Sequence, residues 1–122
     1  MGIHDEMTNS GNLDWVSRIR AELSQAEAAR AAGNEGMARV CARRAAGIAA
    51  GEYLNQRNLP SSNQSAFERL KTLQSRTEIS PRARDVIAHF LLRITPEHRL
   101  PIDADLIDEA KWLMKELVGH EV

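Results

Sequence analysis

Apolar residues recur at intervals of three and four along most of this chain, and this spacing restricts the possible fold more than any other feature. Val16, Ile19, Leu23 and Ala26 are one such series. An α-helix turns once every 3.6 residues, so side chains spaced in this way share one face of a helix. Aromatic residues make up only 4% of the chain, and runs of β-branched residues and short hairpin turns are missing. The pattern therefore predicts an all-α fold.

Capping and helix-breaking residues divide the pattern into five helices. Ser65 and Glu68 form the signature of a capping box, and Ser80 followed by Pro81 is typical of a helix start. The expected limits are Asn12 or Asp14 to Gly33, Asn34 to about Arg57, Ser65 to about Ser75, Ser80 to Pro96, and the segment "PIDAD" to Gly119. Short connections favour antiparallel neighbours. We therefore expect an up-and-down four-helix bundle with one extra short helix.

The chain has the length of one domain. Its 122 residues are enough to bury a core without disulfides or metals. Residues 1–11 fall outside the helical pattern and are predicted to be a flexible N-terminal tail, and residues 12–122 are predicted to form a single helical-bundle domain. No apolar run reaches the roughly 18 residues that a membrane-spanning helix needs, and no signal peptide is recognisable. We expect a cytoplasmic protein with no membrane contact.

Two glycines lie inside the second expected helix, among alanines. Glycine at such a position weakens a helix by up to about 1 kcal/mol. Gly47 and Gly51 therefore predict that another helix approaches this backbone closely.

Several classes of site are not expected. The formal net charge is -1, so no overall positive field attracts nucleic acid or an anionic membrane. Cys41 is the only cysteine, and it falls on the apolar face of a helix, where a buried and inert thiol is expected. None of the three histidines other than His89, namely His4, His98 and His120, has a metal-ligand partner three or four residues after it, and no phosphate-binding loop occurs. We therefore expect neither a metal nor a cofactor.

The stretch "RARDVIAHF" carries the candidate catalytic pair, Arg84 and His89. A histidine side chain ordinarily titrates near neutral pH, and a guanidinium binds phosphate through two hydrogen bonds. Five residues on a helix correspond to about 140° around its axis, so one helix does not place both groups on one face. Catalysis would need helix distortion or a second protomer. Alternatively, both are surface residues, with His89 paired to Asp85 one turn earlier.

Three arginines of the second helix, Arg39, Arg43 and Arg44, are the candidate RNA- or nucleotide-binding residues. The alternative is that they are solvated or pair with acidic residues of the first helix. Trp15 and Trp112 both lie beside the apolar stripes of their helices. Large aromatic residues in such positions are typical of interfaces and favour a homodimer, with packing inside the domain as the alternative.

The order of these segments resembles a known family. The stretch "LSQAEAARAAGNEGMARVCARRAAGIAAGEYLNQRNLP" is similar to the first two helices of the HEPN family, small helical domains of higher eukaryotes and prokaryotes. A short helix like "AFERLKTL", a fourth helix like "ARDVIAHF" and a last helix like "DLIDEAKWLMKEL" follow in the same order. The resemblance spans roughly residues 13–118 and implies a HEPN-like bundle. It is carried mostly by small and apolar residues.

The resemblance also implies a site. RNA-cleaving members of the family carry an arginine with a polar residue after it, then a histidine that four to six residues separate from the arginine. Two protomers usually bring these groups together at a dimer interface. Arg84, Asp85 and His89 fit this spacing, which implies His89 as the proton-transfer group and Arg84 as the phosphate clamp. Asp85 stands where asparagine is commoner, and Leu91 stands where tyrosine is often found.

By resemblance, then, we expect a nucleotide- or RNA-binding domain of a toxin–antitoxin or defence system, with an antitoxin or a nucleotidyltransferase as partner. An enzyme is not the favoured interpretation. If the protein is one, the resemblance implies a metal-independent endoribonuclease. The alternative is a catalytically silent helical adaptor that mediates protein–protein interaction.

Overall fold

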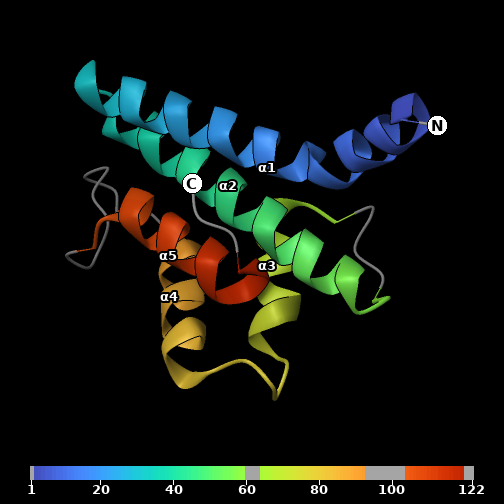
Figure 1. Ribbon diagram of the computed structural model, residues 1–122. Helices are drawn as coiled ribbons and strands as arrows, with labels where there is room; N and C mark the ends of the chain where they lie inside the picture. Colours follow the sequence, from blue (N-terminus) through green and yellow to red (C-terminus); the bar gives the residue numbers. More distant parts are fainter. Residues whose placement is uncertain (1, 60–63, 93–103, 120–122) are drawn as a thin grey trace.

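The computed structural model describes residues 2–59, 64–92 and 104–119, with side chains described from residue 14 onward. All regular secondary structure in these ranges is helical, and the helices pack as a bundle, which confirms the predicted all-α fold (Figure 1). The helices are α1 (Gly2–Ala31), α2 (Glu35–Gln56), α3 (Ala66–Gln74), α4 (Pro81–Leu91) and α5 (Leu106–Val118). No helix in the described ranges is both long and apolar enough to cross a membrane.

Most of the helix ends were predicted from their capping residues. The side chain of Asn34 accepts a hydrogen bond from the Met37 amide at 3.1 Å and caps α2. Ser65 and Glu68 form the predicted capping box of α3, with both of its bonds at 3.2 Å. Ser80 caps α4, with Pro81 in the first turn. These contacts satisfy amides that would otherwise lack a partner at the helix start.

Two helix ends differ from the prediction. Helix α1 begins at Gly2 and not at Asn12 or Asp14, because no proline interrupts this segment and residues of the capping type also tolerate helix interiors. The flexibility of residues 1–11 stays a prediction. Helix α4 ends at Leu91, before Pro96, with Leu92 in an extended conformation. Arg43 of α2 donates a hydrogen bond from Nε to the carbonyl of Phe90 at 2.9 Å and so stabilises this earlier end.

Helix α2 is the central element of the bundle. It pairs with α1 in an antiparallel hairpin, and it also packs against α3 and α5. Helices α3 and α4 form a second, shorter pair, and α4 reaches α5 on its other side (Figure 1). In the sequence, α3 separates α2 from α4 and α5. The groove between α4 and α5 is thus built from helices that do not directly follow the α1–α2 hairpin.

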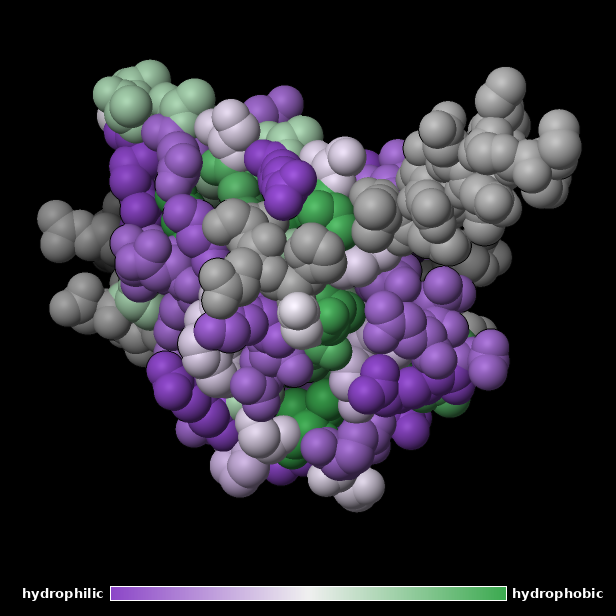
Figure 2. Space-filling model, viewed as in Figure 1, coloured by the Kyte–Doolittle hydropathy of each residue, from purple (hydrophilic) through white to green (hydrophobic). Residues whose placement is uncertain are grey.

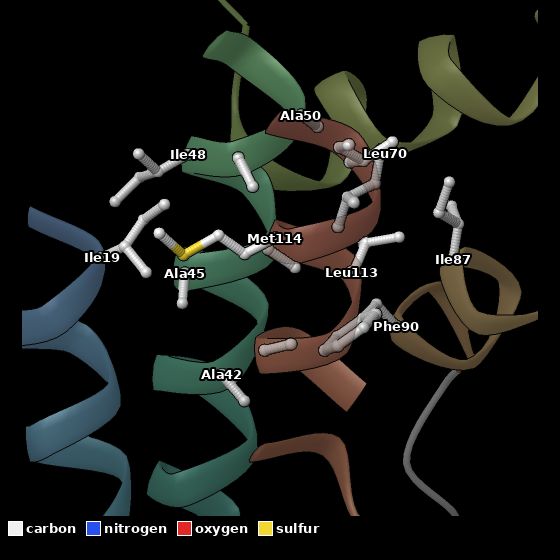
Figure 3. Close-up of a cluster of buried hydrophobic side chains, with 14 of the residues drawn as sticks. Ile19, Ala42, Ala45, Ile48, Ala50, Leu70, Ile87, Phe90, Leu113 and Met114 are labelled. Atoms are coloured by element: carbon white, nitrogen blue, oxygen red, sulfur yellow. The ribbon is translucent and has the colours of Figure 1, made fainter. Parts of the chain in front are cut away.

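Small residues allow α2 to occupy this central position. Its middle stretch, residues 45–51, is buried without interruption. In Figure 3, Ile19 of α1 approaches α2 from one side, and Leu70, Leu113 and Phe90 lie on the other. Alanine and glycine keep the helix thin, so neighbours on several sides can pack closely against its backbone.

The closest of these approaches is at Gly47, as the sequence predicted. A Cβ atom at this position would lie 2.4 Å from the Cβ and 2.7 Å from the Cα of Ala66, at the start of α3. At Gly51 the nearest atom is the Cδ of Arg69 at 3.2 Å, which belongs to a long side chain. The first contact is with backbone that cannot move freely, and the second is with a flexible side chain.

An arginine joins three helix ends. Nη1 of Arg30, in the last turn of α1, lies 3.0 and 3.1 Å from the two carboxylate oxygens of Asp105. Its Nε and Nη2 lie 3.0 and 2.8 Å from the carboxylate of Glu35, at the start of α2. Asp105 also caps α5 through the amides of Ile107 and Asp108. The start of α5, which leads into the groove described below, is thus fixed to the α1–α2 turn.

We expect this ion-pair cluster to make the free energy of unfolding depend on pH in the acid range. The hydrogen bond from Arg30 holds the pKa of Glu35 below its ordinary value; desolvation acts to raise the pKa of Asp105, but hydrogen bonds from Arg30 and from the α5 amides lower it overall. As the pH falls, the unfolded chain therefore binds protons at these two carboxylates before the folded chain does. The contribution is present above about pH 4 and is lost as pH falls through the lowered values.

Urea unfolding of the wild type and of Arg30→Gln between pH 2.5 and 7 measures this dependence. The side chains involved are more than one-third exposed, so we expect the difference between the two proteins to stay below about 1 kcal/mol at pH 7 and to vanish at the acid end. Parallel curves, with the same difference at every pH, would contradict this origin.

Candidate functional site

Arg84 lies on α4 but faces the turn that connects α3 to α4. Its Nε donates a hydrogen bond to the carbonyl of Gln74 at 3.2 Å. Its Nη2 donates to the carbonyls of Arg76 at 2.9 Å and Ile79 at 3.2 Å. The guanidinium therefore closes the end of α3 and the turn after it. A group held by three backbone carbonyls has few donors left for a phosphate.

His89 lies on the same helix and faces α5. Its Nδ1 is 2.8 and 3.0 Å from the two carboxylate oxygens of Glu109. Both side chains are partly exposed, at 30% and 23%. The pairing of His89 with Asp85, which the sequence offered as the alternative, is replaced by a contact between helices, although Asp85 lies on the same groove.

The structure does not bring Arg84 and His89 together within one chain. The first contacts the α3–α4 turn, and the second contacts α5, as their angular separation on the helix requires. A shared catalytic role for the pair stays a prediction, and only a second protomer could supply the missing partner.

The three arginines of α2 do not form one uniform cationic surface. Arg43 reaches the end of α4 through the carbonyl of Phe90. Arg44 lies 4.0 Å from Glu22 of α1, the kind of pairing that the sequence offered as the alternative. Arg39 is half-buried and also has an interaction partner. Their binding of RNA or a nucleotide stays a prediction.

The two tryptophans are half-buried and pack against the core, in line with the alternative of packing inside the domain. On the face seen in Figure 2, the most hydrophobic residues show as a narrow central strip between hydrophilic ones, and a group of paler green residues lies at the upper left edge. The homodimer stays a prediction.

Cys41 is buried, and its Sγ lies 3.9 Å from Oε1 of Gln25. Burial raises the pKa of the thiol. A reactive cysteine needs a lowered pKa, because the thiolate is the nucleophile. The geometry therefore agrees with an inert structural thiol.

The best candidate for a binding site is the groove between α4 and α5, with a volume of about 400 Å³. Its surface is mostly apolar, with carboxylates around it. Seven residues line it: Arg82, Asp85, Val86, His89, Asp108, Glu109 and Trp112. Three carboxylates thus face one arginine. Among the residues that the structure describes, Asp85 and Asp108 have no side-chain partner for their carboxylates, since Asp108 is bonded only through its amide.

The aromatic part of the groove is Trp112, and a cation already lies on it. The guanidinium carbon of Arg82 is 4.5 Å from the centroid of the Trp112 ring. Sequence reasoning noticed Trp112 but missed Arg82, Asp108 and Glu109 as site residues. Helical spacing was the available signal: Arg82, Asp85 and His89 recur at intervals of three and four on α4, and Asp108 and Trp112 are four residues apart on α5. Which faces meet was not visible in the sequence.

The chemistry open to this groove is limited. When Nδ1 of His89 carries a proton, it donates to Glu109, and Nε2 is left as a base. The lining has no hydroxyl or thiol that could act as a nucleophile. The surrounding carboxylates oppose the approach of a phosphodiester. Within the described ranges, no three histidine, cysteine or acidic side chains are grouped so that they could hold a metal ion.

The HEPN resemblance stays a prediction from the sequence. No protein-family model, curated protein or solved structure matches this chain significantly.

Proposed function

We propose that this protein is a non-enzymatic helical adaptor that holds a protein partner in the α4–α5 groove. One contrast carries the proposal: the guanidinium of Arg84 is bonded inside the domain, whereas the groove offers the apolar surfaces of Val86 and Trp112 and carboxylates that have no side-chain partner among the described residues. Protein-binding surfaces combine these features, since apolar area supplies affinity and charged groups at the rim supply selectivity.

The HEPN-like RNA-binding function receives less support from the geometry. An RNA site needs several cations that point together into solvent, because phosphates dominate affinity for nucleic acids. Arg84 and Arg43 instead serve backbone carbonyls, and the α4–α5 groove has an excess of carboxylates. A ribonuclease would also need the partner protomer to complete its site.

Site-specific photocrosslinking tests the adaptor function. A benzoylphenylalanine placed at Lys115, which is exposed on α5 one turn after Trp112 and leaves the carboxylates of the groove in place, should form a crosslinked product with protein in the organism that encodes this chain. The same residue at Ser24, exposed on α1, is the matched control and should not. Trp112→Ala should remove the product, because it takes away the largest apolar surface of the groove.

Two results would reject the adaptor function. One is crosslinking to RNA in place of protein. The other is cleavage of RNA by the purified protein, or growth arrest on expression, that His89→Ala abolishes. The second result would restore the endoribonuclease interpretation.

A further inference from the structure

The contact between Arg82 and Trp112 is the feature of the groove that says most about its ligand. Arg82 lies in the first turn of α4 and is exposed, and its guanidinium lies over the indole ring. No ion pair of Arg82 is present among the described residues. An exposed cation–π contact is weak, and water can replace it. The ring face is therefore suited to a guanidinium but holds its present one loosely.

The unpaired carboxylates lie on the same groove. Asp85 is one turn after Arg82 on α4, and Asp108 is one turn before Trp112 on α5. A guanidinium entering between the helices could therefore stack on the indole and reach a carboxylate from either side. Val86 adds an apolar surface for the methylene groups of the entering side chain, which commonly pack on apolar neighbours.

We propose that Arg82 is an internal stand-in for an arginine of the partner, and that this arginine displaces Arg82 from Trp112 and pairs with Asp85 and Asp108. The inference rests on the proposed function and specifies its partner: a segment with an arginine beside apolar residues. Arginine is favoured over lysine, because a planar guanidinium both stacks on a ring and binds a carboxylate through two hydrogen bonds.

Charge favours this partner over an anionic one. Once Arg82 leaves the ring, the lining consists of three carboxylates, His89 and two apolar residues. An acidic peptide or an RNA would then face carboxylates without a fixed cation, whereas a cationic peptide would find complementary charge. For an anionic ligand, Arg82 would be the principal contact. The effect of removing Arg82 therefore has opposite signs for the two kinds of ligand.

The first measurement uses Trp112 as the reporter. The chain has two tryptophans, so Trp15→Phe leaves Trp112 as the only one. Titration with a peptide that carries one arginine between leucines should change the fluorescence of Trp112 until the change saturates. The same peptide with citrulline, which is neutral and nearly the same shape, should bind roughly tenfold more weakly, and Asp85→Asn and Asp108→Asn should each weaken the arginine peptide by roughly threefold. Calorimetry on the unmodified chain gives the same comparison without the Trp15 substitution.

The second measurement is decisive. Arg82→Ala should strengthen binding of the arginine peptide by roughly threefold, since the competitor on the ring is removed. Arg20→Ala, which makes the same charge change on an exposed position of α1, should leave the affinity unchanged. Weaker binding in Arg82→Ala, or equal binding of the arginine and citrulline peptides, would overturn the proposal.

The two proposals fail in different ways. If photocrosslinking at Lys115 captures protein but an acidic peptide binds and requires Arg82, the adaptor function stands and the arginine partner is wrong. If a short RNA binds in place of any peptide and crosslinks at Lys115, both are wrong. If neither peptide nor RNA binds and no crosslink forms, both are also rejected.

Discussion

Gly47→Ala should destabilise the domain by about 3 kcal/mol, although the change adds one methyl group and raises helix propensity. The added Cβ would lie 2.4 Å from the Cβ of Ala66 and 2.7 Å from its Cα. Both distances are far inside van der Waals contact, so α3 must move away from α2. Forcing extra carbon into a packed core typically costs about 1–3 kcal/mol, and more where backbone has to shift. Urea or thermal unfolding followed by circular dichroism measures the loss.

Two further variants separate this clash from any general effect of glycine. Gly51→Ala lies one turn further along the same helix, and the three atoms nearest to its Cβ all belong to the side chain of Arg69, so we expect it to be neutral or to stabilise by up to about 1 kcal/mol. Ala66→Gly should recover only part of the stability lost in Gly47→Ala, because it removes the opposing Cβ but leaves the Cα, 2.7 Å from the added carbon. Equal losses at both glycines would show that α3 does not press on Gly47.

The fold could be predicted because local signals and packing agree. Asn34 and Ser65 mark helix starts with side-chain oxygens, and Gly47 marks a close approach through its missing side chain. Such signals act within a few residues and are readable in the sequence. The start of α1 could not be predicted in this way, because residues that cap helices are also tolerated inside them. Whether such a residue begins a helix or lies within it depends on its contacts with the rest of the chain.

The site was harder to predict for a physical reason. The sequence gives the type of a side chain and its angle on a helix, but not the residues that this side chain contacts. Arg84 resembled a phosphate ligand, yet backbone carbonyls of the α3–α4 turn occupy its guanidinium. Glu109 attracted no notice, yet it is the partner of His89. Both outcomes depend on how α3, α4 and α5 meet, and such long-range packing leaves only faint traces in local spacing.

Stability measurements can determine which role Arg84 has. Arg84→Met keeps an apolar stem of similar length but removes the guanidinium, so the carbonyls of Gln74, Arg76 and Ile79 lose their donors. Each bond to a charged donor contributes about 1.5–3 kcal/mol, but this side chain is only half-buried and water can replace part of the loss. We therefore expect a total loss of about 2 kcal/mol, measured by urea unfolding.

Hydrogen exchange locates the effect and excludes the other role. In Arg84→Met, protection should fall first in the α3–α4 turn, where the amides of Arg76 and Ile79 are bonded. Arg84→Lys should recover only part of the loss, because one ammonium cannot reproduce the spread of three donors. A residue kept for catalysis shows the opposite pattern, since its replacement commonly leaves stability unchanged or raises it. If Arg84→Met is as stable as the wild type, the turn does not depend on Arg84, and its guanidinium is available to a ligand or to a second protomer.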